Sequence, residues 1–175
     1  MKQNLLINQP VTQEMIDFTK DKMKRHIEAV NYLASLIGRN YPDHDSDKLT
    51  APLLNIFAIE YWYKFKTDTP PVGEDREAFH TATISHYKNS AHHGQYWKNP
   101  HDMPFDAMEE MACDMFAMYA EKEIRGKLAK HYLDYWAEDQ PKWFPYSPAQ
   151  DVVMRDLFAK LESRCNRDNL LNIWK

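Results

Sequence analysis

The chain has 175 residues, of which 43% are hydrophobic, and this is enough apolar material for one domain with a buried core. Its net charge is −4, and Lys and Arg are dispersed among acids, so the sequence does not predict a basic surface for extended nucleic acid. A small anion can still bind to a local group of basic residues. Two cysteines exclude a disulfide framework and predict a cytoplasmic protein. The N-terminal apolar run is too short for a signal peptide, and no stretch reaches membrane-spanning length, so no membrane partner is expected.

Helical periodicity dominates the sequence, and no run of residues alternates as a strand would. Apolar residues at three- and four-residue steps predict a long helix over about residues 12–37, which Thr12 can cap and Gly38 stops. The remaining helices are expected over about residues 51–65, 74–90, 104–125, 126–139 and 149–164. Loops are expected over residues 40–48, 66–73, 92–104 and 139–148.

We therefore predict one all-α domain over residues 1–175, with a C-terminal helix and a short tail over about residues 149–175. Histidines and aspartates recur along its predicted helices, with one adjacent pair, His44-Asp45. Imidazole and carboxylate ligands suit Mn, Fe, Zn, Co or Ni, and a site without thiolates is unlike a structural zinc site. The pattern predicts one or two divalent transition-metal ions in the core of a helical bundle.

His26 and the string HDSDK provide the first candidates. His26 precedes Val30 by four residues and borders the apolar face of its helix, where a lone histidine is usually a core residue. His44 and Asp45 can reach one ion where a helix begins, with the carboxylate offsetting the charge of a cation. Lys48, one turn later, can bind a substrate phosphate or simply pair with a neighbouring aspartate. An isolated His-Asp pair of this kind is more often a solvated turn.

The string HYKNSAHH provides three more histidines. His86, Asn89 and His93 fall on one face of a helix if the helix continues that far. Two histidines separated by two turns are too distant for one ion but suit two ions side by side. His92 can be a ligand, an acid or an orienting group, and the plain alternative for all three histidines is a polar helix end.

Glu110 and Asp114 are separated by four residues and share one helix face. Asp114 lies among methionines, and a carboxylate in such a setting needs a partner, for which a metal ion is one candidate. The alternative is a surface acid beside the apolar stripe. Glu110 can orient a ligand histidine or act as a general base. His80, His101 and His131 have no comparable neighbours.

The ligand order His…His-Asp…His…His…Asp resembles the HD-domain superfamily, and HDSDK is similar to the HD-x-x-K string of its dinuclear phosphodiesterase branch. HDSDKL, HYKNSAHHGQYW and MPFDAMEEMACDM also resemble a family of uncharacterised bacterial and phage proteins with HD-x-SK, HHW-like and EM-x-x-DW elements. Four residues depart from that pattern, Asp47, the pair Ser90-Ala91 and Met115, and none is a proposed ligand.

The superfamily resemblance implies an HD-domain-like bundle and assigns His26, His44, Asp45 and Asp114 to a first metal ion. His86 with His93, His92 or both would complete a second, bridged by Asp45. The expected function is metal-dependent hydrolysis of a nucleotide or related small phosphate ester, with Glu110, Lys48 and His92 in catalytic roles.

Two other functions fit the same residues. One is an HD-type non-haem di-iron oxygenase, which would use a set of four His and two Asp. The other is a non-catalytic, metal-stabilised binding module, which a phage member could use against host defence in the host cytoplasm. A homo-oligomer is compatible with the sequence, which specifies neither the substrate nor the native metal.

Overall fold

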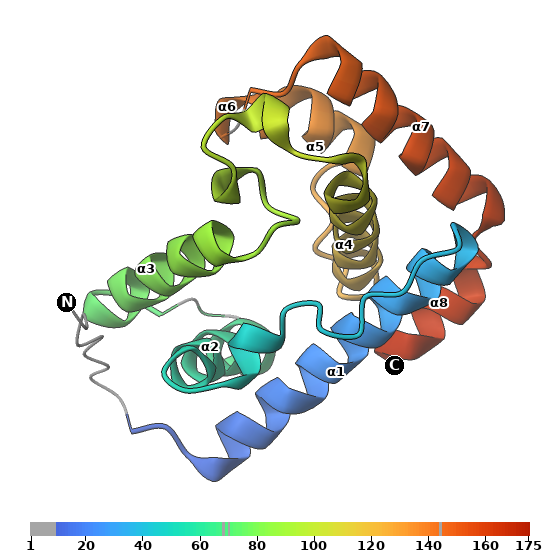
Figure 1. Ribbon diagram of the computed structural model, residues 1–175. Helices are drawn as coiled ribbons and strands as arrows, with labels where there is room; N and C mark the ends of the chain where they lie inside the picture. The colour runs from blue at the N-terminus through green and yellow to red at the C-terminus, as the bar shows by residue number, and fades with distance from the viewer. Residues whose placement is uncertain (1–9, 68, 70, 144) are drawn as a thin grey trace. The chain divides into compact units, whose positions relative to one another are not determined.

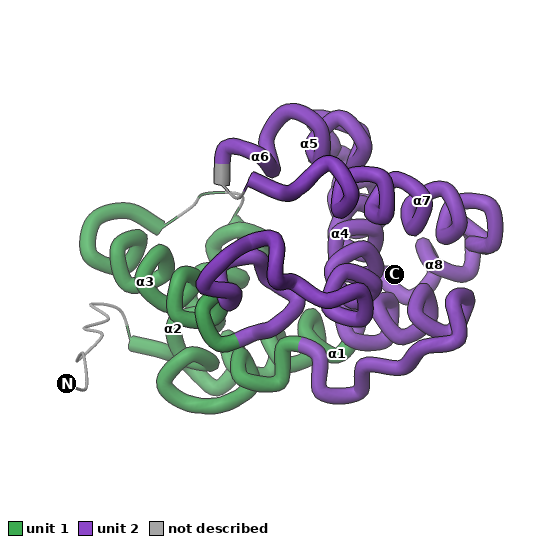
Figure 2. The backbone as a smooth tube through the Cα atoms, turned by 45° about the horizontal axis from the view of Figure 1, so that its top comes forward, with its two compact units in different colours: residues 1–24, 45–89 green, residues 25–44, 90–175 purple. Residues whose placement is uncertain are grey.

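The computed structural model describes residues 10–67, 69, 71–143 and 145–175, and these form helices and connecting turns without any strand (Figure 1). The predicted all-α class is confirmed. The described chain divides into two compact units, which interleave along the sequence (Figure 2). The first contains the residues up to Lys24 together with residues 45–89, and the second contains residues 25–44 and 90–175. The single-domain expectation stays a prediction.

Helix α1, Gln13–Leu36, begins and ends as its sequence predicts. The Thr12 hydroxyl accepts a hydrogen bond from the Met15 amide at 3.2 Å, which satisfies one of the free amides at the helix start. At the other end Gly38 adopts a φ of 77°, and the Arg39 amide donates back to the helix. Glycine takes this left-handed conformation without a steric penalty, so the helix stops here.

In the first unit, α2 (Leu53–Trp62) packs against α3 (Glu74–Asn89). A 3-10 turn over Ser46–Leu49 precedes α2, and a π-helical turn over Tyr63–Thr67 follows it. The contact buries the apolar side chains of Ile56, Phe57, Ala78 and Ala82. The predicted helix over residues 51–65 therefore starts just after Pro52 and ends in a wider turn.

In the second unit, α4 (Phe105–Ile124) contacts three other helices, and these are α5 (Tyr132–Glu138), α7 (Pro148–Arg164) and α8 (Arg167–Trp174). Their shared core includes Met111, Phe116, Trp136, Phe158 and Leu161. Because α4 lies in this contact, the side chains along its length are held in fixed positions. This matters for two of the carboxylates on α4, Glu110 and Asp114.

Two elements of the second unit differ from the sequence-based expectation. The segment predicted as a loop over residues 139–148 contains a single helical turn, α6 (Gln140–Trp143). The predicted tail forms α8, because the Asn166 side chain caps it and Leu170 is fully buried. We expected that the N-terminal apolar run is not a signal peptide. This run lies in residues 1–9, outside the described part. No described helix is both long and apolar enough to cross a membrane.

Candidate metal centre

Three predicted ligands meet in the second unit: His26 from α1, His44 from the loop that follows it, and Asp114 from α4. The Nε2 atoms of the two histidines lie 3.1 Å apart. The Asp114 Oδ1 atom is 3.1 Å from His26 Nε2 and 3.7 Å from His44 Nε2. Both histidines are buried. Two nitrogens and one oxygen thus converge on one point.

The loop that carries His44 is held by two sets of polar contacts. The Asn31 side chain of α1 accepts from the Tyr41 amide at 2.6 Å and donates to the Tyr41 carbonyl at 3.0 Å. Arg39 donates from Nε to the Glu109 carboxylate on α4 at 2.6 Å. The loop is therefore tied to both of the helices that carry the other two ligands, and His44 is positioned against them.

Glu110 lies one turn before Asp114 on α4 and contacts two histidines. Its Oε1 atom is 2.8 Å from Nδ1 of His44 and 3.2 Å from Nδ1 of His92. Burial raises the pKa of Glu110, but the hydrogen bonds and charges of these two histidines outweigh it and lower the pKa to about 2. Both contacts of Glu110 are to ring nitrogens of histidines, so the geometry places this carboxylate where it can orient the two rings.

The Glu110 contact also fixes which His44 nitrogen carries a proton. An ionised carboxylate can only accept, so His44 Nδ1 donates to it and Nε2 of the neutral ring carries the lone pair. That lone pair faces His26 Nε2 and the Asp114 carboxylate. Burial raises the pKa of Asp114, but hydrogen bonds and charges from the two histidines lower it well below its ordinary value. The three atoms fit a divalent cation, and these buried groups can hold a metal ion.

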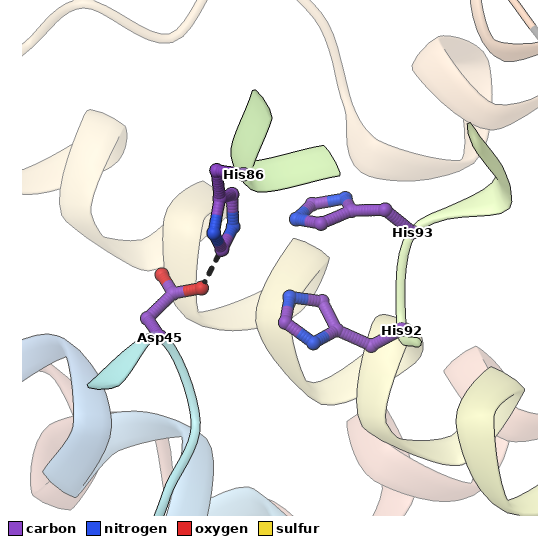
Figure 3. A group of neighbouring side chains, drawn as sticks. All are labelled: Asp45, His86, His92 and His93. Atoms are coloured by element: carbon purple, nitrogen blue, oxygen red, sulfur yellow. Dashed lines mark ion pairs between the residues drawn. The ribbon is translucent and has the colours of Figure 1, made fainter. Parts of the chain in front are cut away.

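A second polar group lies in the first unit, around Asp45 (Figure 3). Asp45 Oδ1 is 3.0 Å from His86 Nε2, and Asp45 Oδ2 pairs with the Lys48 ammonium at 2.6 Å. Asp45 has a φ of 56°, the one positive value among the described non-glycine residues. Aspartate tolerates this conformation better than most residues, and such strain concentrates at functional sites.

Sequence reasoning assigned no role to Asp47, which also contacts His86. Its two carboxylate oxygens are 3.0 and 2.9 Å from His86 Nδ1. Burial raises the pKa of Asp47, but the hydrogen bond from His86, together with the positive charge of this ring when it is protonated, lowers it below its ordinary value overall. The spacing between these two residues, one on a turn and the other at the end of α3, gives no signal in the sequence.

The comparisons with known proteins place the chain in a family. The sequence model of a family described as "Family of unknown function (DUF5662)" matches residues 15–163. The chain belongs to this family. No curated protein and no solved structure matches it. The matched range of this DUF5662 member includes every predicted ligand, but the family description assigns them no role.

Each unit by itself brings together some of the residues that the sequence singled out in this DUF5662 member. The second unit gathers His26, His44, His92, Glu110 and Asp114, and the first gathers Asp45, Lys48 and His86. Their individual roles stay predictions.

Four histidines remain, and the first of them, His93, is a potential metal ligand. His93 is half-buried, and its ring lies 4.2 Å from that of His92, centroid to centroid (Figure 3). His80 and His101 are exposed, while His131 caps α5 by accepting from the Leu133 amide. None of these three belongs to a potential metal-ligand group among the described residues.

Proposed function

We propose that this protein is a metal-dependent phosphohydrolase that acts on a nucleotide or a related small phosphate ester. One observation carries the proposal: Nε2 of His26, Nε2 of His44 and Oδ1 of Asp114 converge in a buried position. Glu110 orients the His44 ring for that arrangement. The resemblance of the ligand order to the HD-domain superfamily supports hydrolysis as the reaction, because phosphohydrolysis is the common chemistry of that superfamily.

In this proposal His26, His44 and Asp114 hold the first ion, and Asp45, the next residue after His44, is available on the same short stretch of chain. His86, which faces Asp45 through Nε2, belongs to a second ion. A divalent ion at such a centre supplies Lewis acidity toward a phosphate ester and toward water. The protein's part is to fix the direction of each ligand lone pair and to exclude competing water by burial.

The remaining polar residues bind the substrate and move protons. The Lys48 ammonium is held against Asp45 Oδ2 and also lies 5.4 Å from the centre of the Phe57 ring, so a positive charge is kept in place beside Asp45. There it can neutralise the charge of a phosphate. His92 donates through Nδ1 to Glu110, which leaves Nε2 of the neutral ring to exchange a proton with the leaving group or with water. His93 remains a candidate ligand.

Elemental analysis of the purified protein by mass spectrometry tests the proposal, with His44→Ala as the variant and His80→Ala as its control. Both variants remove one imidazole, but His80 is exposed and lies outside the ligand groups. We expect one or two Zn, Mn, Co or Ni ions per chain in the wild type and in His80→Ala, with loss of metal in His44→Ala. A screen of nucleotides and other phosphate esters then follows with the loaded protein.

Other outcomes would redirect or end the proposal. About two irons per chain, lost in His44→Ala, would favour the di-iron oxygenase instead, because that chemistry needs both ions. Metal without turnover of any phosphate ester would favour the non-catalytic binding module. Wild-type protein that binds no metal even after reconstitution, or His44→Ala that keeps its metal, would refute the metal site itself.

A further inference from the structure

The His86 imidazole lies between two carboxylates of the first unit. Asp45 Oδ1 is 3.0 Å from Nε2, and both oxygens of Asp47 lie within 3.0 Å of Nδ1. His86 is fully buried at the end of α3, whereas the Asp47 side chain keeps 35% of its exposure on the turn over Ser46–Leu49. The ring is therefore held from both sides, and by carboxylates that face different nitrogens.

We infer that Asp47 is a positioning residue that turns His86 into a metal ligand. A carboxylate accepts hydrogen bonds and does not donate them, so Asp47 holds a proton on Nδ1 of His86. In the neutral ring Nε2 then carries the lone pair, and that lone pair points at Asp45 Oδ1. Two electron-rich atoms 3.0 Å apart repel each other unless a cation lies between them, and the Lys48 ammonium pairs with the other oxygen, Oδ2. A divalent cation bound by both removes that repulsion. This inference rests on the proposed metal centre and specifies what Asp47 adds to it.

The two oxygens of Asp45 are consistent with this arrangement. Oδ2 pairs with the Lys48 ammonium at 2.6 Å, while Oδ1 faces His86. The lysine thus fixes the carboxylate without occupying the oxygen that the histidine faces. Metal-ligating histidines commonly donate their second ring N–H to a carboxylate, which sets the ring orientation and makes the ligand nitrogen more basic. Asp47 and His86 have this geometry.

A purely structural explanation makes a different prediction. In that case His86 is doubly protonated and bridges two carboxylates as a buried ion pair, with no metal involved. Removing Asp47 would then destabilise the fold but would leave metal affinity unchanged. Under our inference, removing Asp47 weakens metal binding through His86 alone. The two explanations therefore differ in a binding measurement, which does not depend on activity.

The experiment is a competitive titration of metal-free protein with Co²⁺ or Zn²⁺ against a chromophoric chelator, for the wild type, Asp47→Ala, Asp47→Asn, His86→Ala and the double variant Asp47→Ala/His86→Ala. Asp43→Ala serves as the matched control, because it removes an exposed aspartate of the same short segment. We expect Asp47→Ala to lower the affinity for the ion that depends on His86 by roughly 10–100-fold, which is typical of losing such an orienting partner. Asp47→Asn keeps an oxygen acceptor and should therefore lose less of its metal affinity.

The double variant separates an action through His86 from a general effect. If Asp47 acts through His86, its removal has no further effect on metal binding once His86 is absent. Nitrogen-15 NMR of the metal-free wild type should show the His86 proton on Nδ1, and Asp47→Ala should lose that preference. Circular dichroism confirms that each variant is folded, and Asp47→Asn remains a test if Asp47→Ala is not.

Two kinds of failure are distinguishable. If the wild type binds metal and His86→Ala weakens it, but folded Asp47→Ala or Asp47→Asn binds as the wild type does, only the role of Asp47 is overturned. An equal loss from Asp47→Ala in the presence and absence of His86 would overturn it as well. If the wild type binds no metal, this inference fails together with the proposed function.

Discussion

Replacing Glu110 by Gln in the metal-free protein should produce a pH-dependent loss of stability. His44 and His92 both donate to Glu110 Oε1, and together they lower its pKa from an ordinary value of 4.5 to about 2 against the opposing effect of burial. A folded-state pKa below the unfolded one stabilises the folded protein at any pH above the ordinary value. That stabilisation is lost as the pH falls from about 4.5 toward 2.

The magnitude follows from the size of this change. At about 1.36 kcal/mol for each pKa unit, the fall in the pKa of Glu110 from 4.5 to about 2 corresponds to roughly 3.4 kcal/mol. The Glu110 side chain keeps 19% of its exposure, and water screens its charge, so we reduce this to about 1.5 kcal/mol. Gln keeps an oxygen that can accept both hydrogen bonds, so the substitution removes the charge with little change in shape.

The assay is urea unfolding of chelator-treated protein at several pH values between 7 and 3, for the wild type, Glu110→Gln and Glu28→Gln. Glu28 is an exposed residue of α1 and controls for loss of a carboxylate elsewhere. We expect the free energy of unfolding of Glu110→Gln to be about 1.5 kcal/mol lower than that of the wild type at pH 7, and this difference should become smaller below pH 4. A difference in the free energy of unfolding that stays constant down to pH 3, or no difference at pH 7, would refute the reasoning about these charges.

Three further predictions concern the metal, the core and a helix end. Adding the bound metal at about 100 times its Kd should stabilise the wild type by about 2.7 kcal/mol and raise Tm by roughly 5–10 °C, and His44→Ala should show no such rise in thermal denaturation. Asp151→Ala should cost about 1–3 kcal/mol in urea unfolding, because it strips the 2.7 Å hydrogen bond from Nε1 of the buried Trp136. Asp156→Ala, an exposed change in the same helix, should stay within about 0.5 kcal/mol. Gly38→Ala should cost about 1 kcal/mol, because the φ of 77° is strained for any residue with a Cβ; an unchanged Tm would contradict this.

Helices with several independent signals were predictable from the sequence. For α1, a long apolar stripe, the Thr12 cap and Gly38 all agree, and the observed ends differ from the predicted ones by one residue. For α8 the signals are weak, because the segment is short and polar and only Leu170 and Trp174 are buried in it. Its stability comes from packing on α4, which the local sequence does not report.

The candidate site shows the same division. His26, Glu110 and Asp114 could be chosen from residue type and helix face, because they lie on segments with clear periodicity, and His44 could be chosen from the adjacent His-Asp pair in a predicted loop. The contact of Asp47 with His86 could not be chosen in this way, since the two residues are 39 positions apart and Asp47 looks like an ordinary turn acid. Long-range hydrogen bonds to ring nitrogens depend on how the elements pack, and no local pattern encodes them.

The acids of the two ligand groups are of two kinds, which differ in the histidine nitrogen that the carboxylate faces. Asp114 and Asp45 face the Nε2 atoms of histidines, whereas Glu110 and Asp47 face Nδ1 atoms. An acid that faces the lone-pair nitrogen can share a cation with it, and an acid that accepts the N–H proton can only orient the ring. The same arrangement occurs in each unit separately, around His44 in one and His86 in the other. We therefore expect removal of an acid of the first kind to abolish binding of its ion, and removal of the second kind to weaken it.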